Sequence, residues 1–228
     1  MNKLTCIFLL IMSSSVNAIA ISSLFEVADR NGHSSFELIN NDEKDMYINL
    51  KMAKVDINNG KKELVKLDKN NLSSWEFTTT PSRTILRPGA RKKIKLKYIC
   101  KSDCEKNEDK LFFVDVAPVP YSESNKSSLA FAFGYRVYFL VPAKKVVGSY
   151  SINRTKSGFS FKNDSNTMLT AVLNTCSKDF NSDCIYQYRV LSKQNKSFTF
   201  PDNFGKKDKI NFTVINANEE FSESYLLH

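Results

Sequence analysis

The chain has 228 residues, of which 42% are hydrophobic and 25% are charged, and its formal net charge is +9. This length is enough for two domains of about 100 residues, each with its own core. The sequence has two histidines, His33 and His228, and it contains no glycine-rich phosphate loop and no acidic pair in a recognisable context. The sequence lacks the sets of residues that nucleophilic or metal catalysis requires. We therefore expect no enzymatic activity, no metal site and no cofactor.

The N-terminus has the order of a secretory signal peptide. Lys3 precedes an apolar run from Leu4 to Met12, and small and polar residues follow as far as Ala18. We predict that cleavage after Ala18 removes residues 1–18, and Cys6 with them. The apolar run is roughly half of the ~20 residues that a membrane-spanning helix needs, and no later segment qualifies. We therefore expect a secreted protein without membrane insertion.

Four cysteines remain after cleavage, in two close pairs that lie far apart in the chain. The pairs are Cys100 with Cys104 and Cys176 with Cys184. In an exported protein this spacing predicts two local disulfides, one in each half of the chain. Zinc binding is the competing interpretation, but neither pair has the spacing of a zinc site.

Short segments rich in β-branched and aromatic residues alternate with clusters of Asn, Asp, Ser, Gly and Lys, and no stretch has a convincing helical period. The dipeptide Asn59-Gly60 predicts a hairpin turn. In the first half we predict strands near residues 21–27, 35–40, 47–55, 94–98, 110–116 and 129–141.

A second set of strands follows Pro142 and a short link at residues 143–145. These strands are expected near residues 150–152, 159–162, 169–173, 185–191, 196–200 and 210–215. About seven short strands per half is the number expected of an immunoglobulin-like sandwich. We predict an all-β protein of two immunoglobulin-like β-sandwich domains, at residues 19–142 and 143–228.

The last strand of the first half is long and strongly apolar. Residues 129–141 read LAFAFGYRVYFLV, with large side chains at Leu129, Phe131, Phe133, Tyr135, Val137 and Phe139. It is either an ordinary core strand or a strand kept for pairing with another chain, because an undefended apolar edge invites such pairing. The exposed apolar face leaves two states open for the chain without a partner, a free monomer or a self-associated form that covers this strand.

The order of motifs around this strand resembles the periplasmic pilus-assembly chaperone family. Residues 80–96 read TPSRTILRPGARKKIKL, and residues 110–120 read KLFFVDVAPVP. The first segment matches the family's Thr-Pro and Pro-Gly dipeptides, which precede a basic strand. The second segment matches the family's next strand, which ends in a Pro-rich turn. The Cys176–Cys184 pair resembles a late disulfide of the alternative branch that serves common-pilus fimbriae. The resemblance spans nearly the whole mature chain.

The resemblance implies that the protein is a periplasmic chaperone that caps fimbrial subunits by donor-strand complementation and delivers them to an outer-membrane usher. It places Leu129, Phe131, Phe133 and Tyr135 on the donor strand, and Arg136 as the anchor of the subunit's terminal carboxylate. A guanidinium suits this role because it binds a carboxylate bidentately.

The chain departs from the family in its first strand, because residues 19–28 contain no basic side chain. Classical members of the family have an arginine in this strand. We expect either Arg30 or a residue of the 91–97 strand such as Lys95 to take the place of that arginine. Lysines alternate with apolar residues from Lys93 to Tyr98, which predicts a strand with a basic solvated face, a defended sheet edge, or contact with an acidic subunit or the usher. Two other interpretations stay open: a pilus subunit or adhesin, and a generic secreted immunoglobulin-like binding module.

Overall fold

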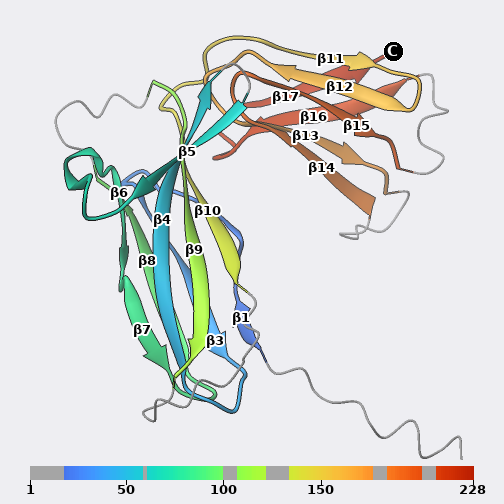
Figure 1. The fold of residues 1–228 in the computed structure, drawn as a ribbon. Helices are drawn as coiled ribbons and strands as arrows, with labels where there is room; N and C mark the ends of the chain where they lie inside the picture. The colour runs from blue at the N-terminus through green and yellow to red at the C-terminus, as the bar shows by residue number, and fades with distance from the viewer. Residues whose placement is uncertain (1–17, 59–60, 100–106, 122–133, 177–183, 202–208) are drawn as a thin grey trace, which may run out of the picture.

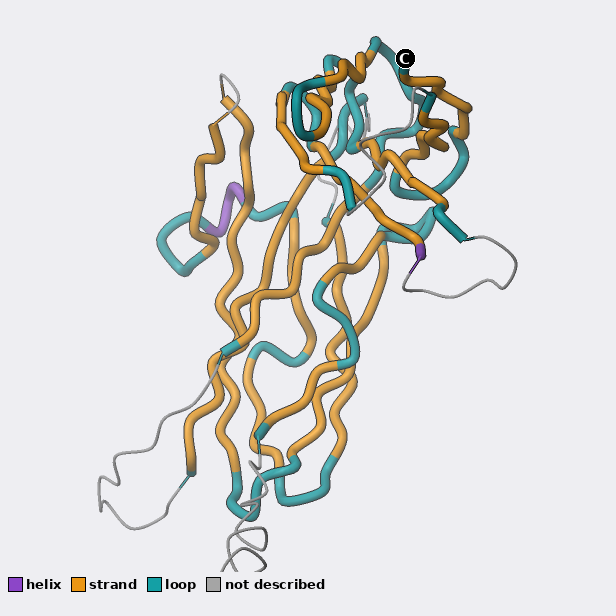
Figure 2. Tube along the Cα trace, turned by 90° about the vertical axis from the view of Figure 1, so that its right-hand side faces the viewer, coloured by secondary structure: helices purple, strands orange, loops and turns teal. Residues whose placement is uncertain are grey.

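A computed structural model describes residues 18–58, 61–99, 107–121, 134–176, 184–201 and 209–228. Over these residues the protein is all-β, as predicted, and the only helix with more than one described residue is the short η1 (Leu72–Ser74). The strands form two sandwiches that lie at an angle to each other (Figure 1; Figure 2). Within the same residues no helix is long and apolar enough to cross a membrane. The domain boundary at residue 142 stays a prediction.

The first sandwich contains strands β1 to β10. One of its sheets has the order β1-β3-β8-β6, and the other has the order β2-β10-β9-β4-β5, with β7 beside β4. The strands are β1 (Ile19–Ile21), β2 (Phe25–Val27), β3 (His33–Asn40), β4 (Met46–Asn58), β5 (Lys61–Leu67), β6 (Phe77–Thr80), β7 (Arg83–Leu86), β8 (Arg91–Tyr98), β9 (Lys110–Pro120) and β10 (Tyr135–Val141).

The second sandwich contains strands β11 to β17. Its sheets have the orders β11-β12-β15 and β14-β13-β16-β17. The strands are β11 (Tyr150–Arg154), β12 (Gly158–Asn163), β13 (Leu169–Asn174), β14 (Ile185–Val190), β15 (Gln194–Thr199), β16 (Ile210–Asn216) and β17 (Ser222–Leu227).

Period-two alternation of side chains builds both cores, because successive side chains of a strand point to opposite faces. In β8, Ile94 and Leu96 are fully buried while the lysines between them face solvent. Three rings stack at the centre of the first core: the ring of Phe77 lies 5.1 Å from that of Phe112 and 5.2 Å from that of Phe139, centroid to centroid. Each buried ring contributes roughly 1.5–3 kcal/mol of hydrophobic stabilisation.

The strand predictions hold for β11 to β16 and for most of the first sandwich, but two kinds of error occur. The single strand predicted over residues 21–27 is two strands, β1 and β2, which belong to different sheets. Four strands were not predicted: β5, β6, β7 and β17. In β5 only Leu67 is buried, so the segment shows no alternation. The hairpin turn at residues 59–60 lies outside the described residues, but its flanking residues Asn58 and Lys61 pair with each other.

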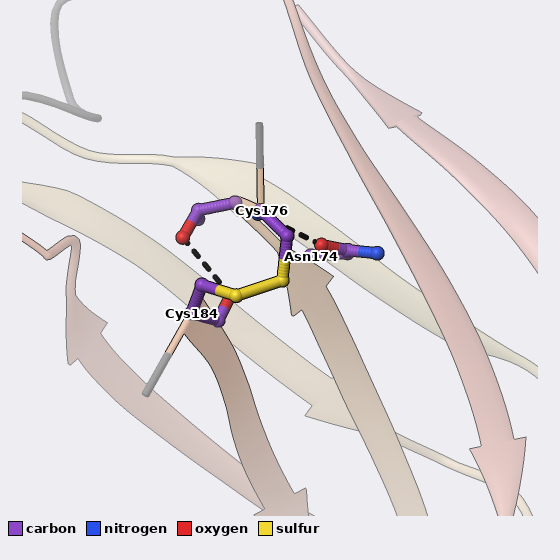
Figure 3. Close-up of a disulfide and its surroundings, with 4 residues drawn as sticks. Asn174, Cys176 and Cys184 are labelled. Carbon is purple, nitrogen blue, oxygen red and sulfur yellow. Dashed lines mark hydrogen bonds between the residues drawn. A yellow bond between two sulfur atoms is a disulfide. The ribbon is translucent and has the colours of Figure 1, made fainter. Parts of the chain in front are cut away.

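The predicted disulfide between Cys176 and Cys184 is present, just after β13 and just before β14 (Figure 3). The Asn174 side-chain carbonyl accepts the Cys176 N–H at 2.9 Å. The Thr175 hydroxyl and backbone N–H both donate to the Cys184 carbonyl, each at 2.9 Å. Covalent and hydrogen bonds therefore join the same two strand ends. Cys100 and Cys104 lie outside the described residues, and their pairing stays a prediction.

Each sandwich has a buried asparagine at the end of a strand, and the side chain of this asparagine joins the two facing sheets. Asn40 ends β3 and Asn163 ends β12, and both side chains are fully buried. Each amide nitrogen donates to the carbonyl four residues ahead at 2.8 Å, and to the last residue of a facing strand, Leu86 or Val190, at 2.9 Å. Each amide oxygen accepts the N–H two residues ahead at 3.0 Å.

We expect Asn40→Ala and Asn163→Ala each to lower the free energy of unfolding by about 2–4 kcal/mol, because two carbonyls lose their donor, both buried at Asn163 and one buried at Asn40. Urea unfolding measures this change. The control is Asn58→Ala, whose exposed side chain bonds only to Glu63 among the described residues, and which should change the free energy by less than about 0.5 kcal/mol. If the buried and exposed variants behave alike, the buried amides do not stabilise the fold in this way.

Candidate functional site

The residues predicted to bind a partner fall around β10. Leu129, Phe131 and Phe133 lie outside the described residues, so their role stays a prediction. Tyr135 is the first residue of β10, and Arg136 is the second. Figure 1 shows β10 beside β9 on the side of the first sandwich that faces the second.

At the start of β10, one of the two edges of the strand has no neighbouring strand among the described residues. The strand pairs with β9 along its whole length, from Tyr135 to Val141, but it pairs with β2 only from Tyr138 to Leu140. Over residues 135–137 no described strand lies on the side away from β9. An edge of this kind presents unpaired N–H and C=O groups to which an added strand can bond.

Tyr135 fastens the start of β10 to the first strand. Its hydroxyl donates to the Ile19 carbonyl at 2.6 Å, and its half-buried ring packs against the first core. The side chain of Tyr135 therefore holds the open edge in place from the core side.

Arg136 projects from the opposite face of β10 and is bound to the neighbouring strand. Its Nε donates to Asp115 Oδ1 at 2.6 Å, and a terminal nitrogen donates to Asp115 Oδ2 at 2.9 Å. The guanidinium lies 3.8 Å from the centre of the Phe113 ring. Hydrogen bonding to Asp115 raises the pKa of Arg136. Because a guanidinium has five N–H donors, donors remain for a second acceptor.

The two other basic candidates lie elsewhere. Lys95 is on the solvent-facing side of β8, a central strand of the β1-β3-β8-β6 sheet, so the structure does not bring it to Arg136. Arg30 follows β2 and lines a hollow between the sandwiches, together with Lys144. Its side chain is 96% exposed and lies 3.9 Å from a carboxylate oxygen of Glu220.

Asp109, just before β9, joins the two sandwiches. Its carboxylate accepts the N–H of Ala143 at 2.8 Å and the N–H of Met168 at 2.6 Å. Its own N–H donates to the Asn166 carbonyl at 2.9 Å. Burial raises the pKa of Asp109, against the lowering effect of the hydrogen bonds that it accepts.

An apolar contact surrounds this hydrogen-bonded junction. Met168 of the second sandwich is buried against the face of the β2-β10-β9-β4-β5 sheet that points away from the first core. Leu191 and Ala217 pack beside it. The buried first-sandwich residues in this cluster are Ala53, Val55, Leu111, Phe113 and Leu140. The second sandwich is therefore seated beside the strand that carries Arg136.

The sequence did not identify Asp109 or the aromatic residues Phe25 and Tyr138 beside the junction. Asp109 follows Asn107 and Glu108 in a polar stretch that has the composition of any surface turn. Its role depends on N–H groups more than thirty residues away in the chain, and no local pattern indicates such a contact.

The sequence matches a known fimbrial family. Residues 21–142 match the family model described as CS5 fimbrial protein N-terminal domain. The chain is also 22% identical over 178 residues to an Escherichia coli protein described as an uncharacterized 25.9 kDa protein in the CS5 3′ region. That match covers 75% of this chain and 78% of the relative.

The fold matches solved structures of periplasmic chaperones. The class 5 fimbriae chaperone CfaA has a TM-score of 0.56 and 16% identity, and the match covers 92% of this chain and 99% of CfaA. A chain from a chaperone–tip adhesin complex of CFA/I fimbriae biogenesis has a TM-score of 0.53 and 14% identity. That match covers 92% of this chain and 98% of the other. At these identities the likeness establishes the fold.

Asp109→Asn should destabilise the protein by about 1–3 kcal/mol, because one of the two N–H groups then faces an amide donor. The raised pKa of Asp109 means that the folded protein binds this proton more tightly than the unfolded chain does. Its contribution to stability should therefore fall as the pH rises from about 4, the ordinary range of Asp, through the raised pKa.

Urea unfolding of wild type and Asp109→Asn across this pH range measures the difference. Glu63→Gln is the matched control, since the exposed Glu63 of β5 lies outside the junction and bonds only to Asn58 among the described residues. If the stabilisation by Asp109 instead grows as the pH rises, the hydrogen bonds lower the pKa of Asp109 more than burial raises it. That result would contradict the raised pKa.

Proposed function

Because the chain belongs to the CS5 fimbrial protein family and has the fold of periplasmic fimbrial chaperones, we propose that it is a periplasmic chaperone for fimbrial subunits. In this proposal the protein binds a subunit, keeps it folded and delivers it to an outer-membrane usher. The signal peptide predicted at residues 1–18 supports export to the periplasm.

The open edge of β10 at residues 135–137 is the observation that carries the proposal. It begins at Tyr135 and directly follows Leu129, Phe131 and Phe133, and these four are the predicted donor residues. A subunit that lacks a strand can add its own strand to this edge through backbone hydrogen bonds, while alternate large side chains enter its groove.

Burial of apolar side chains supplies the binding energy in this mechanism. Each donor Phe or Leu that is fully buried in a subunit contributes roughly 1.5–3 kcal/mol before the cost of association. No catalytic step and no nucleotide is required. Binding of this kind is reversible by exchange, since another strand of equal complementarity can replace the donor strand.

The alternative of a pilus subunit fits the structure less well. A subunit lacks its own last strand, whereas β10 is present here and pairs with β9 over seven residues. The aromatic core around Phe139 is closed by this chain alone. The first sandwich therefore does not need a strand from another molecule.

Phe131→Asp and Phe133→Asp should each abolish capture of a fimbrial subunit, because a carboxylate cannot enter an apolar groove without losing its hydration. The test is co-expression of each variant with subunits from the same gene cluster, followed by affinity capture of the complex. Leu72→Asp, at an exposed leucine of η1, is the control and should leave capture unchanged. Undiminished capture by both Phe variants would refute the donor assignment.

A further inference from the structure

The sheet face that points toward the second sandwich carries a row of three aromatic side chains, here called the aromatic floor: Phe25, Tyr138 and Phe113. Phe25 of β2 is the register partner of Tyr138 of β10, which in turn is the register partner of Phe113 of β9. The rings of Tyr138 and Phe113 meet edge to face, with centroids 6.2 Å apart. The floor thus crosses three neighbouring strands.

A cationic side chain lies over each ring of the floor. The guanidinium of Arg136 lies over Phe113, as described above, and Lys62 Nζ of β5 lies 5.9 Å from the centre of the Tyr138 ring. The guanidinium of Arg189 lies 5.6 Å from the centre of the Phe25 ring. Arg189 belongs to β14, so one of these cations comes from the second sandwich.

Lys196 of β15 adds a fourth cation from the second sandwich. It is half-buried, and desolvation, followed by repulsion from Lys62, lowers its pKa. Arg189 and Lys196 flank the turn at residues 191–194, which docks on the first sandwich through Leu191 and through the ion pair of Lys193 with Glu108. The junction therefore holds Arg189 over the floor, and Lys196 lies close enough to Lys62 for the two charges to repel each other.

The positive charge where the two sandwiches meet over the aromatic floor, a region here called the cleft, is poorly balanced. Among the described residues, only Arg136 of the four cations has a carboxylate partner, Asp115. Arg189 donates to the neutral side-chain oxygen of Gln187 at 2.5 Å. Cations gathered on one surface repel one another and create a positive field that attracts anions. An acidic ligand would relieve this repulsion.

We propose that Lys62, Arg189 and Lys196 bind an acidic segment of the subunit across the cleft, with carboxylates between the cations and apolar atoms on the aromatic floor. The identity of the partner rests on the proposed function, whereas the preference for an acidic peptide rests on the cleft alone. Lys62 belongs to the first sandwich, and Arg189 and Lys196 belong to the second. A segment bound to all three cations therefore connects the two sandwiches and fixes the angle between them.

The first test uses the mature chain without a subunit and two synthetic probes, hexaglutamate and hexaglutamine, in calorimetric titrations that start at ~0.15 M salt, where the Debye length is about 8 Å. Wild type should bind hexaglutamate and not hexaglutamine, with affinity that falls as salt rises. The double variant Arg189→Gln with Lys196→Gln should weaken hexaglutamate binding about ten-fold or more, because charge-assisted hydrogen bonds are lost. Lys62→Gln, on the exposed β5, should weaken binding in the same direction.

The matched control is Lys93→Gln with Lys95→Gln, which removes two charges from the solvent-facing side of β8 in the other sheet. It should change the affinity for hexaglutamate less than about two-fold, because exposed charges beyond a Debye length are screened. The inference is overturned if wild type does not distinguish the two peptides, or if this control loses as much affinity as the cleft variants.

Subunit capture with the same variants separates this inference from the proposed function. If both hold, the Arg189 and Lys196 double variant captures less subunit than wild type, and the control does not. Hexaglutamate binding in the cleft without any capture of subunits by wild type would overturn the chaperone proposal and leave the cleft as an acidic-peptide site. Full capture by the double variant would overturn the role of these cations in binding the subunit.

Discussion

Between Ile21 and Phe25 the chain leaves one sheet of the first sandwich and enters the other, and this crossing determines which part of β10 has a neighbour. Hydrogen bonds fix the crossing: Ser22 exchanges two bonds with the backbone of Glu37, and the Ser23 hydroxyl bonds the backbone of Phe25. Because β2 starts only opposite Tyr138, the backbone before it stays open for another strand. The proposed function depends on this opening.

The same strand links the open edge to the second sandwich. β10 begins at the edge, contributes Tyr138 to the aromatic floor, and ends just before Ala143, whose N–H is held by Asp109. A subunit strand added at the edge would therefore lie next to the cleft and its cations. The edge supplies backbone bonding, which any strand can use, whereas the charges of the cleft favour one kind of sequence.

The sequence predicts those parts of the fold that local periodicity encodes. The alternation in β8 is plain because Ile94, Leu96 and Tyr98 face the core and lysines face solvent. The division of the first strand was missed because residues 19–27 form one nearly continuous apolar segment, in which only Ser22 and Ser23 mark the crossing. Asp109, Arg189 and Lys196 could not be assigned, because tertiary contacts between the sandwiches give them their roles.

The most direct test of the central claim is amide hydrogen exchange at residues 135–137, compared between the protein alone and the protein bound to a fimbrial subunit. The N–H groups of a strand alternate between its two sides, and the Tyr138 N–H points away from β9 to the Leu24 carbonyl, so within residues 135–137 only the Arg136 N–H lies on the open side. The account predicts strong protection of this N–H in the complex, with little change at Tyr135 and Val137, which pair with β9, or at Tyr138 to Leu140, where β2 already pairs. A complex that forms while the exchange of the Arg136 N–H stays unchanged would contradict the account.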